Sequence, residues 1–451
     1  MSYDIKIKNG LTINLKGAAQ NIIKKAATPK TISINPSNFH LIIPKMVVKI
    51  GQKISQGDVV FFSKKDERIK FCSPVNGVVK EIIRGAKRKI IEIIIESIGD
   101  NERSSKKAID YENLSSEQVK NLLLDSGCWP FIKQRPYDII ANPSDSPKSI
   151  FISSFNSAPI SADFQIILDD QKEEFKHGVK ILSKLFSGDL NIGIEKNKKS
   201  FLNDIENVKI NTFNGPHPAG NVGVQIHHID PINSGEKVWT LGAEDVANIG
   251  RYFMTGSYNP VRTLAVSGPP VKYPKYYKTI AGSELCEIIK DAGINQNDNL
   301  RFINGDVLTG YKVESDNYLG FYNNTLSVLR EGNHYRMFGW VPFVNNKVPS
   351  IYKTSFSWLF PNKKYDLDTN LNGEERALVV TGEMEKVFPM DILPMQLLKE
   401  CMAGNIEKME SLGIYEVAPE DFSLIDYSSS SKIEAQYIIR KGLDLMISEV
   451  G

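Results

Sequence analysis

The stretch Val47-Val48-Lys49-Ile50-Gly51-Gln52-Lys53-Ile54-Ser55-Gln56-Gly57-Asp58-Val59-Val60-Phe61-Phe62 decides the fold of the first part of the chain. Its short apolar runs have strand character, and the two glycines punctuate them as turn residues. Residues 69–80 repeat the pattern, and the dipeptide Asn76-Gly77 predicts a tight turn between strands. Two such repeats predict a small β domain over residues 41–98.

The two repeats resemble the halves of biotinyl and lipoyl carrier domains, which share the barrel-sandwich hybrid fold. In a carrier domain the tip between the halves holds the modified lysine in a Met-Lys-Met or Asp-Lys-Ala setting. The tip here is Ser63-Lys64-Lys65-Asp66-Glu67-Arg68, which lacks both settings. Two interpretations stay open: a swinging arm on Lys64 or Lys65, and a solvated turn.

Length and composition limit the remaining possibilities. A chain of 451 residues allows about three or four domains, and a net charge of +2 gives no reason to expect a nucleic-acid partner. The four cysteines (Cys72, Cys128, Cys286 and Cys401) lie far apart, so they predict neither a local cluster nor a disulfide framework. No window approaches 18 uncharged apolar residues, so we expect no transmembrane segment and membrane association only through a partner.

Residues 113–255 alternate helix and strand patterns. Ser115 and Gln118 form a capping-box signature for a helix through Leu124, and strand patterns cover 149–155, 191–195 and 208–213. Strands that alternate with helices predict a parallel, Rossmann-like α/β sheet. No G-x-G-x-x-G or G-x-x-x-x-G-K-[ST] string occurs there, so we expect no bound nucleotide.

The expected secondary structure changes three times in the rest of the chain. One helix pattern among strand patterns predicts a β-grasp (SLBB-like) module, an aromatic and β-rich connection follows, and the last part reads as helical. The predicted fold class is therefore α+β and multidomain. The expected parts are a barrel-sandwich hybrid domain at 1–100, a Rossmann-like domain at 101–257, the β-grasp module at 258–330, the connection at 331–373 and a helical domain at 374–451.

Two segments of the helical part match the spacing of a ferredoxin-type motif, C-x2-C-x2-C-x3-C-P, without its cysteines. The first frame falls on Leu378, Thr381, Met384 and Phe388, and the second on Val417, Glu420, Ser423 and Tyr427. These residues cannot replace the soft thiolates that iron requires. The frames indicate either a relic of lost iron–sulfur sites or a chance match in spacing. The polar residues of the second frame predict a pocket partly open to solvent.

This domain order resembles the C subunit of the Rnf electron-transport complex and the flavin-binding NADH subunit of respiratory complex I. Several unusual strings narrow the resemblance to the A subunits (NqrA) of the sodium-translocating NADH:quinone oxidoreductases, from end to end of the chain. The strings are residues 9–17, Pro44-Lys45-Met46, residues 129–136, Ile140-Ala141-Asn142-Pro143, residues 215–220, residues 227–231 and Val238-Trp239-Thr240.

The resemblance implies a respiratory complex of the bacterial inner membrane that oxidises NADH, reduces a quinone such as ubiquinone and exports sodium. The protein would be peripheral, on the cytoplasmic side, docked on the membrane-embedded B subunit and on the other subunits, and not catalytic alone. FAD, FMN, riboflavin and iron–sulfur centres would lie in those partners. This chain would bind no flavin, iron–sulfur cluster or metal and would assist the quinone step; the alternative is a purely structural scaffold.

The segment Trp129-Pro130-Phe131-Ile132-Lys133-Gln134-Arg135-Pro136 is the first candidate for a quinone head group. A quinone needs an aromatic slot with donors to its carbonyl oxygens. Trp129 and Phe131 could form the slot, and Gln134 or Arg135 could donate. The alternative is a connection that packs its aromatic rings against the sheet, with Arg135 paired to Asp138 or to a carbonyl.

Further candidates come from the barrel and from a histidine-containing loop. Lys45 and Met46 open the barrel repeat, where a flexible Met could line a tail channel; the alternative is an ordinary strand start. His217 is a candidate for a quinone-proximal or proton-carrying role, and a structural turn is its alternative. His227 and His228 are adjacent, so on a strand they would face opposite sides and could not share a metal ion.

Overall fold

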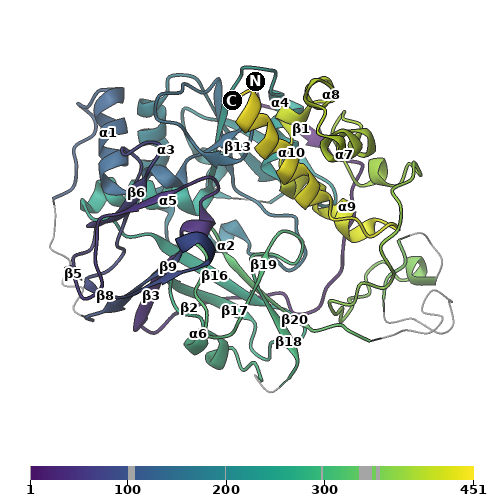
Figure 1. The fold of residues 1–451 in the computed structure, drawn as a ribbon, viewed down its shortest axis with the longest axis horizontal. Helices are drawn as coiled ribbons and strands as arrows, with labels where there is room; N and C mark the ends of the chain where they lie inside the picture. Colours follow the sequence, from purple (N-terminus) through teal and green to yellow (C-terminus); the bar gives the residue numbers. More distant parts are fainter. Residues whose placement is uncertain (1, 100–106, 199, 296–297, 335–347, 352–355) are drawn as a thin grey trace.

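The computed structural model describes the whole chain except residues 1, 100–106, 199, 296–297, 335–347 and 352–355. Four sheets carry the fold, with helices gathered on the seven-stranded sheet (Figure 1). The seven-stranded sheet contains β1 (Asp4–Lys6), β14 (Lys209–Asn214), β13 (Asp189–Glu195), β12 (Ser149–Ser153), β15 (Val238–Gly242), β10 (Lys133–Arg135) and β11 (Ile139–Ile140), in that order.

The barrel consists of a four-stranded and a three-stranded sheet with apolar inner faces. Phe61 and Phe71 stack between neighbouring strands with ring centroids 4.4 Å apart. The strands are β3 (Thr31–Ile34), β9 (Ile90–Ser97), β8 (Gly77–Arg84) and β5 (Lys53–Ile54) in the larger sheet, and β4 (Pro44–Met46), β6 (Val59–Ser63) and β7 (Lys70–Cys72) in the smaller one. Lys64 and Lys65 are exposed between β6 and β7.

The predicted tight turn at Asn76-Gly77 is wrong. This dipeptide connects β7 to β8, which belong to different sheets, and neither residue has a positive φ. The Asn76 side chain instead accepts a hydrogen bond from the Gln56 backbone N–H at 2.8 Å.

The N-terminal strands do not join the two barrel sheets. β1 pairs in parallel with β14 of the seven-stranded sheet, and β2 (Gln20–Lys25) pairs in parallel with β17 (Lys275–Ile280) of the six-stranded sheet. The first 25 residues therefore connect the seven-stranded sheet to the six-stranded sheet before the barrel begins.

The α/β part has the predicted Rossmann-like layering. Its four parallel strands run in the order β14-β13-β12-β15, which is the 3-2-1-4 order of doubly wound folds. Ser115 and Gln118 form both capping-box bonds at the start of α1, as predicted. The helices are α1 (Ser116–Ser126), α2 (Phe164–Leu168), α3 (Lys172–Leu185), α4 (Val222–Ile229) and α5 (Ala243–Thr255).

The third part is a mixed six-stranded sheet with one short helix, α6 (Cys286–Asp291). Its strands are β19 (Tyr311–Val313), β18 (Leu300–Asn304), β20 (Thr325–Arg330), β16 (Val261–Ser267), β17 and β2. A buried ion pair between Arg262 on β16 and Asp245 on α5, with N and O 2.5 Å apart, joins this sheet to the α/β part.

The predicted β-rich connection at 331–373 lies partly outside the described residues. Its described part holds no strand, only the 3-10 turn η5 (Phe356–Leu359) and isolated bridges at Tyr365 and Asp368. These two residues bridge to Leu15 and Arg330, so isolated backbone pairings replace the expected sheet.

The C-terminal part is helical and packs on the α/β sheet. Its elements are η6 (Met384–Lys386), α7 (Pro394–Ala403), α8 (Ile406–Ser411), η7 (Ile414–Glu416), η8 (Pro419–Phe422), α9 (Ser423–Ser428) and α10 (Ala435–Glu449). One apolar cluster joins Met384, Phe388 and Val417 to Phe151 and Phe213 of the α/β part. None of the helices in the described part of the chain is long and apolar enough to cross a membrane.

The contact between α3 and α5 depends on two glycines that face the opposite helix. A Cβ at Gly250 would overlap the carbonyl oxygen of Glu174, and a Cβ at Gly178 would overlap that of Val246. We expect Gly250→Ala to lower the free energy of unfolding by about 1–3 kcal/mol, because the helices must move apart. Urea denaturation checks this, with Met254→Ala on the exposed face of α5 as the control; equal effects of the two variants would contradict the prediction.

Candidate functional site at the junction of the domains

The predicted quinone segment forms a hairpin on the edge of the seven-stranded sheet. After the 3-10 turn η3 (Trp129–Phe131), β10 pairs antiparallel with both β15 and β11. The connection between β10 and β11 contains a cis peptide bond before Pro136 and positive φ angles at Tyr137 and Asp138.

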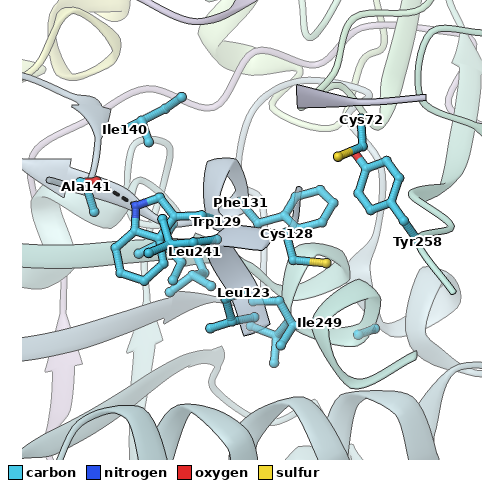
Figure 2. Packing of buried hydrophobic residues seen from close by; sticks show 14 of the residues in the cluster. Cys72, Leu123, Cys128, Trp129, Phe131, Ile140, Ala141, Leu241, Ile249 and Tyr258 are labelled. Atoms are coloured by element: carbon cyan, nitrogen blue, oxygen red, sulfur yellow. Dashed lines mark hydrogen bonds between the residues drawn. The ribbon is translucent and has the colours of Figure 1, made fainter. Parts of the chain in front are cut away.

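Trp129 and Phe131 are used in packing. Figure 2 shows the Trp129 ring within the core, where its Nε1 donates to the Ala141 carbonyl at 2.7 Å. Trp129 also meets Trp239 edge-to-face at 5.5 Å, and Phe131 stacks on Phe321 at 5.2 Å. Both rings are fully buried, so this geometry matches the packing alternative and not an open slot between the two rings.

Gln134 and Arg135 are also bound within the protein. The Gln134 Oε1 accepts from the Asn142 backbone N–H at 3.4 Å. Arg135 is 1% exposed; its Nη2 lies 2.6 Å from Glu420 Oε1 and its Nη1 3.3 Å from Asp421 Oδ2. Both carboxylates belong to η8, and Glu420 is a position of the second iron–sulfur frame. The two sequence signals therefore meet in one ion cluster.

The charges in this cluster change one another's proton affinity. Burial opposes the charge on Arg135, but Asp421, Glu420 and Asp138 together raise its pKa. Burial raises the pKa of Asp421, although Arg135 opposes that rise. Asp138 is also buried, yet Lys133, Arg135 and Arg440 hold its pKa at about 2. The guanidinium therefore stays charged, and these carboxylates supply its counter-charge.

A cavity of about 180 Å³ lies directly beside the hairpin. Every major part of the chain contributes to its walls: Phe39 and His40 from the barrel region, Lys133 and Asp138 from the hairpin, Tyr322 from the six-stranded-sheet part, and Pro419 and Arg440 from the helical part. The Lys133 Nζ lies 4.6 Å from the centre of the Tyr322 ring. The cavity therefore combines aromatic walls with cationic donors.

Arg440 lines this cavity with a guanidinium that other groups hold in place. Its Nε bonds Asp444 at 3.0 Å and its Nη1 donates to the Tyr137 carbonyl at 2.8 Å. Its Nη2 is buried and has no hydrogen-bond partner among the described residues. His40 also pairs with Asp444, at 2.7 Å. No motif in the sequence marks His40, Tyr322 or Arg440, and Lys133 is not among the predicted quinone residues of the candidate segment.

The barrel candidates lie on a different element. Lys45 and Met46 are on β4; the Lys45 Nζ is 2.8 Å from Glu67 and 5.1 Å from the Phe62 ring centre. Met46 is half-buried and packs against the larger core cluster. Neither side chain lines the cavity beside the hairpin.

His217 is buried where the N-terminal segment crosses the α/β part. The Ser157 hydroxyl lies 3.0 Å from His217 Nδ1, and the Leu11 N–H donates to the His217 carbonyl at 2.9 Å. Its Nε2 has no hydrogen-bond partner among the described residues. Burial lowers the pKa of His217 to about 4, against the opposing charge of Asp306. The imidazole is therefore neutral at physiological pH.

His227 and His228 lie on the helix α4, so the strand geometry assumed for them is wrong. The His227 Nδ1 lies 2.7 Å from Glu416, and its Nε2 accepts from the Asp391 N–H at 2.9 Å. His228 bonds the Val224 carbonyl at 2.9 Å. In the part of the chain that the structure describes, no group of three or more His, Cys, Asp or Glu side chains could hold a metal ion.

The second frame is partly open, as predicted: Ser423 and Tyr427 line a cavity of about 930 Å³, and the Glu420 side chain, which pairs with Arg135, is 38% exposed. Val417 is buried. In the first frame Met384 and Phe388 are buried, and Phe388 lies 4.9 Å from the Phe422 ring. The frame positions therefore act mainly as packing and ion-pairing positions.

We expect Arg135→Met to lower the free energy of unfolding by about 3–5 kcal/mol, because the buried Asp421 carboxylate loses its counter-charge. Urea denaturation measures the loss, and faster proteolysis of the helical part should accompany it. Arg68→Met is the matched control: Arg68 pairs with Asp66 at the surface, where a pair contributes about 0–1 kcal/mol. The cluster assignment is wrong if both variants lose the same stability.

We expect His217 to make the protein sensitive to acid. Its pKa of about 4 lies below the ordinary value of 6.5, so the unfolded chain takes up a proton that the folded chain excludes. This contribution to stability is complete above pH 6.5 and is lost as the pH falls to about 4, by on the order of 3 kcal/mol. Urea denaturation between these pH values should show a shallower dependence for His217→Asn than for the control His334→Asn at an exposed position; identical slopes would contradict the assignment.

Three models of protein-domain families match successive parts of this chain. The model of the NqrA N-terminal barrel-sandwich hybrid domain matches residues 5–97. The NqrA second alpha/beta domain matches residues 114–258, and the NQRA C-terminal domain matches residues 263–315. Solved NAD+-reducing [NiFe]-hydrogenase chains in the air-oxidized and H2-reduced states align over 75% and 76% of this chain and 62% and 63% of their own length, at 11% and 12% identity and TM-scores of 0.38 and 0.40.

Full-length relatives are more informative. The A subunit of the Na(+)-translocating NADH-quinone reductase of Photorhabdus laumondii is 34% identical over 97% of this chain and 98% of its own length. The same protein of Hahella chejuensis is 35% identical over 97% and 98%, and that of Neisseria meningitidis serogroup B is 32% identical over 99% and 100%. With this identity across nearly the whole of both chains, the chain belongs to the NqrA family, the A subunits of the Na(+)-translocating NADH-quinone reductases.

Proposed function

We propose that this chain contributes to the quinone-reduction step of the Na+-translocating NADH-quinone reductase complex. It would be a peripheral subunit on the cytoplasmic side of the membrane, docked on the membrane-embedded B subunit. NADH oxidation, Na+ transport and the FAD, FMN, riboflavin and iron–sulfur centres would belong to the partner subunits. The shared name of its full-length relatives supports the assignment to the complex.

The observation that carries the quinone role is the cavity beside the hairpin. A quinone head group requires apolar or aromatic walls and donors aimed at its two carbonyl oxygens. Phe39 and Tyr322 offer the walls, and the Lys133 ammonium offers a donor beside the guanidinium of Arg440. On this proposal Trp129 and Arg135 act indirectly, because they hold the hairpin that carries Lys133.

The runner-up is a structural scaffold, and a specific observation favours it too. All four side chains first considered for the quinone on the hairpin segment are buried in internal contacts. A scaffold would use this buried cluster to present a rigid outer surface to its partners, and the quinone would bind wholly in the membrane partner.

We further propose that the two frames are relics of lost iron–sulfur sites. Support comes from the residues that now occupy them, because Met384, Phe388 and Val417 belong to one apolar cluster. Apolar burial of this kind stabilises a fold where metal bonds no longer can.

We expect Lys133→Met to raise the KM for quinone of the assembled complex about tenfold, because one charged donor is lost. Tyr322→Leu should raise this KM in the same direction by removing an aromatic wall. Steady-state quinone reduction measures both variants, and electron transfer from NADH to a soluble artificial acceptor should be unchanged.

The matched control is Lys237→Met, since Lys237 has a similar exposure and one carboxylate partner, Asp145, but does not line the cavity. A quinone KM that stays at the parent value in both cavity variants would reject the quinone role and support the scaffold.

A further inference from the structure

A short run of large apolar side chains is exposed on the connection before the helical part. Within five residues, Phe356 is 47% exposed, Trp358 54%, Leu359 52% and Phe360 61%. Single exposed apolar residues are common on protein surfaces, but a contiguous group marks an interaction site. We propose that residues 356–364 form a membrane anchor that inserts into the interfacial layer of an anionic phospholipid bilayer.

The anchor is fixed to the body of the protein at its C-terminal side. The Asn14 side chain donates to the Pro361 carbonyl at 2.7 Å. Tyr365 is buried, and its backbone N–H and carbonyl bond Asn14 and Lys16 at 2.8 and 2.9 Å. Contacts with the N-terminal segment therefore fix the C-terminal end of the apolar turn to the body of the protein.

The anchor also lies at an end of the molecule. In Figure 1 the short green helix of η5 is at the right edge, at the opposite end of the longest axis from the barrel strands β5 and β8. A surface at one end of the molecule can meet a flat bilayer without the barrel at the other end colliding with it.

The directions of the side chains favour a fluid partner over a protein groove. A 3-10 turn has three residues per turn, so Phe356 and Leu359 share one face and Trp358 points about 120° away. Phe360 follows after the turn. A groove on a protein covers one face of such a turn, whereas lipid surrounds all of its faces.

The composition of the segment favours the interfacial layer of the membrane over its hydrocarbon core, and anionic over neutral lipids. Trp is enriched where apolar chains meet head groups, and a four-residue turn is far too short to span a hydrocarbon core of roughly 30 Å. Lys363 and Lys364 follow the apolar turn after Pro361 and Asn362 and are both exposed. Lysines at this position attract anionic head groups while the aromatic rings enter the layer beneath them.

Co-sedimentation of the full chain with vesicles tests the anchor without any quinone, so its outcome is independent of the proposed quinone role. The parent chain should bind vesicles of phosphatidylglycerol and phosphatidylcholine. The triple substitution Phe356→Ser, Trp358→Ser and Phe360→Ser should weaken binding about a hundredfold, because three large apolar side chains are removed. Lys363→Gln with Lys364→Gln should weaken it about thirtyfold on these vesicles and hardly at all on pure phosphatidylcholine.

The matched control is the triple substitution Ile22→Ser, Ile50→Ser and Ile98→Ser, which removes three equally exposed apolar residues elsewhere and should leave vesicle binding unchanged. Thermal unfolding of every variant should match the parent. In the complex reconstituted into liposomes, brominated lipids should quench a fluorescence component that Trp358→Phe removes.

Two results would overturn the anchor. One is vesicle binding that the aromatic triple substitution leaves unchanged. The other is no vesicle binding and no lipid quenching, together with weaker assembly of the aromatic variant with its partner subunits, which would assign the segment to a protein contact.

Discussion

The buried guanidinium of Arg135 is the constraint on which the arrangement of the C-terminal part depends. A side chain that is 1% exposed cannot obtain its counter-charge from solvent, and an isolated buried charge is very costly. The protein meets this cost with Glu420 and Asp421 from η8 and with Asp138 from the hairpin itself. The sheet edge and the helical part are therefore held together by charges that neither could keep buried alone.

The same contact builds the cavity beside the hairpin. Because η8 must lie over Arg135, the adjacent Pro419 becomes a wall of the cavity, and α10 brings Arg440 against Tyr137 and the hairpin. Lys133 precedes Arg135 by two residues on β10. This strand therefore carries both the buried guanidinium and the ammonium group that lines the cavity. Structural and functional effects of this strand can be separated only at Lys133, since changes at Arg135 disturb both.

The sequence was informative wherever the determining contacts are local. The capping box of Ser115 and Gln118 involves residues three apart, and the alternation of strands and helices predicts the Rossmann-like layering by itself. It was uninformative where the partner is remote: Arg135 and Glu420 are 285 residues apart, and β1 is a three-residue strand with no local sign of its partner β14. His227 and His228 were misplaced because two adjacent residues carry no periodicity that separates a strand from α4.

The empty iron–sulfur frame and the hairpin motif looked like separate signals, yet Glu420 belongs to the first and pairs with Arg135 of the second. A carboxylate at a frame position is a poor substitute for an iron-binding thiolate but a good counter-ion for a guanidinium. On the proposed loss of a cluster, the requirement at this position would have changed from binding a metal to neutralising a cation. Removing this carboxylate and keeping Arg135 would still leave the guanidinium with Asp421 and Asp138, so it should be less disruptive than removing Arg135, which leaves the buried Asp421 without its counter-charge.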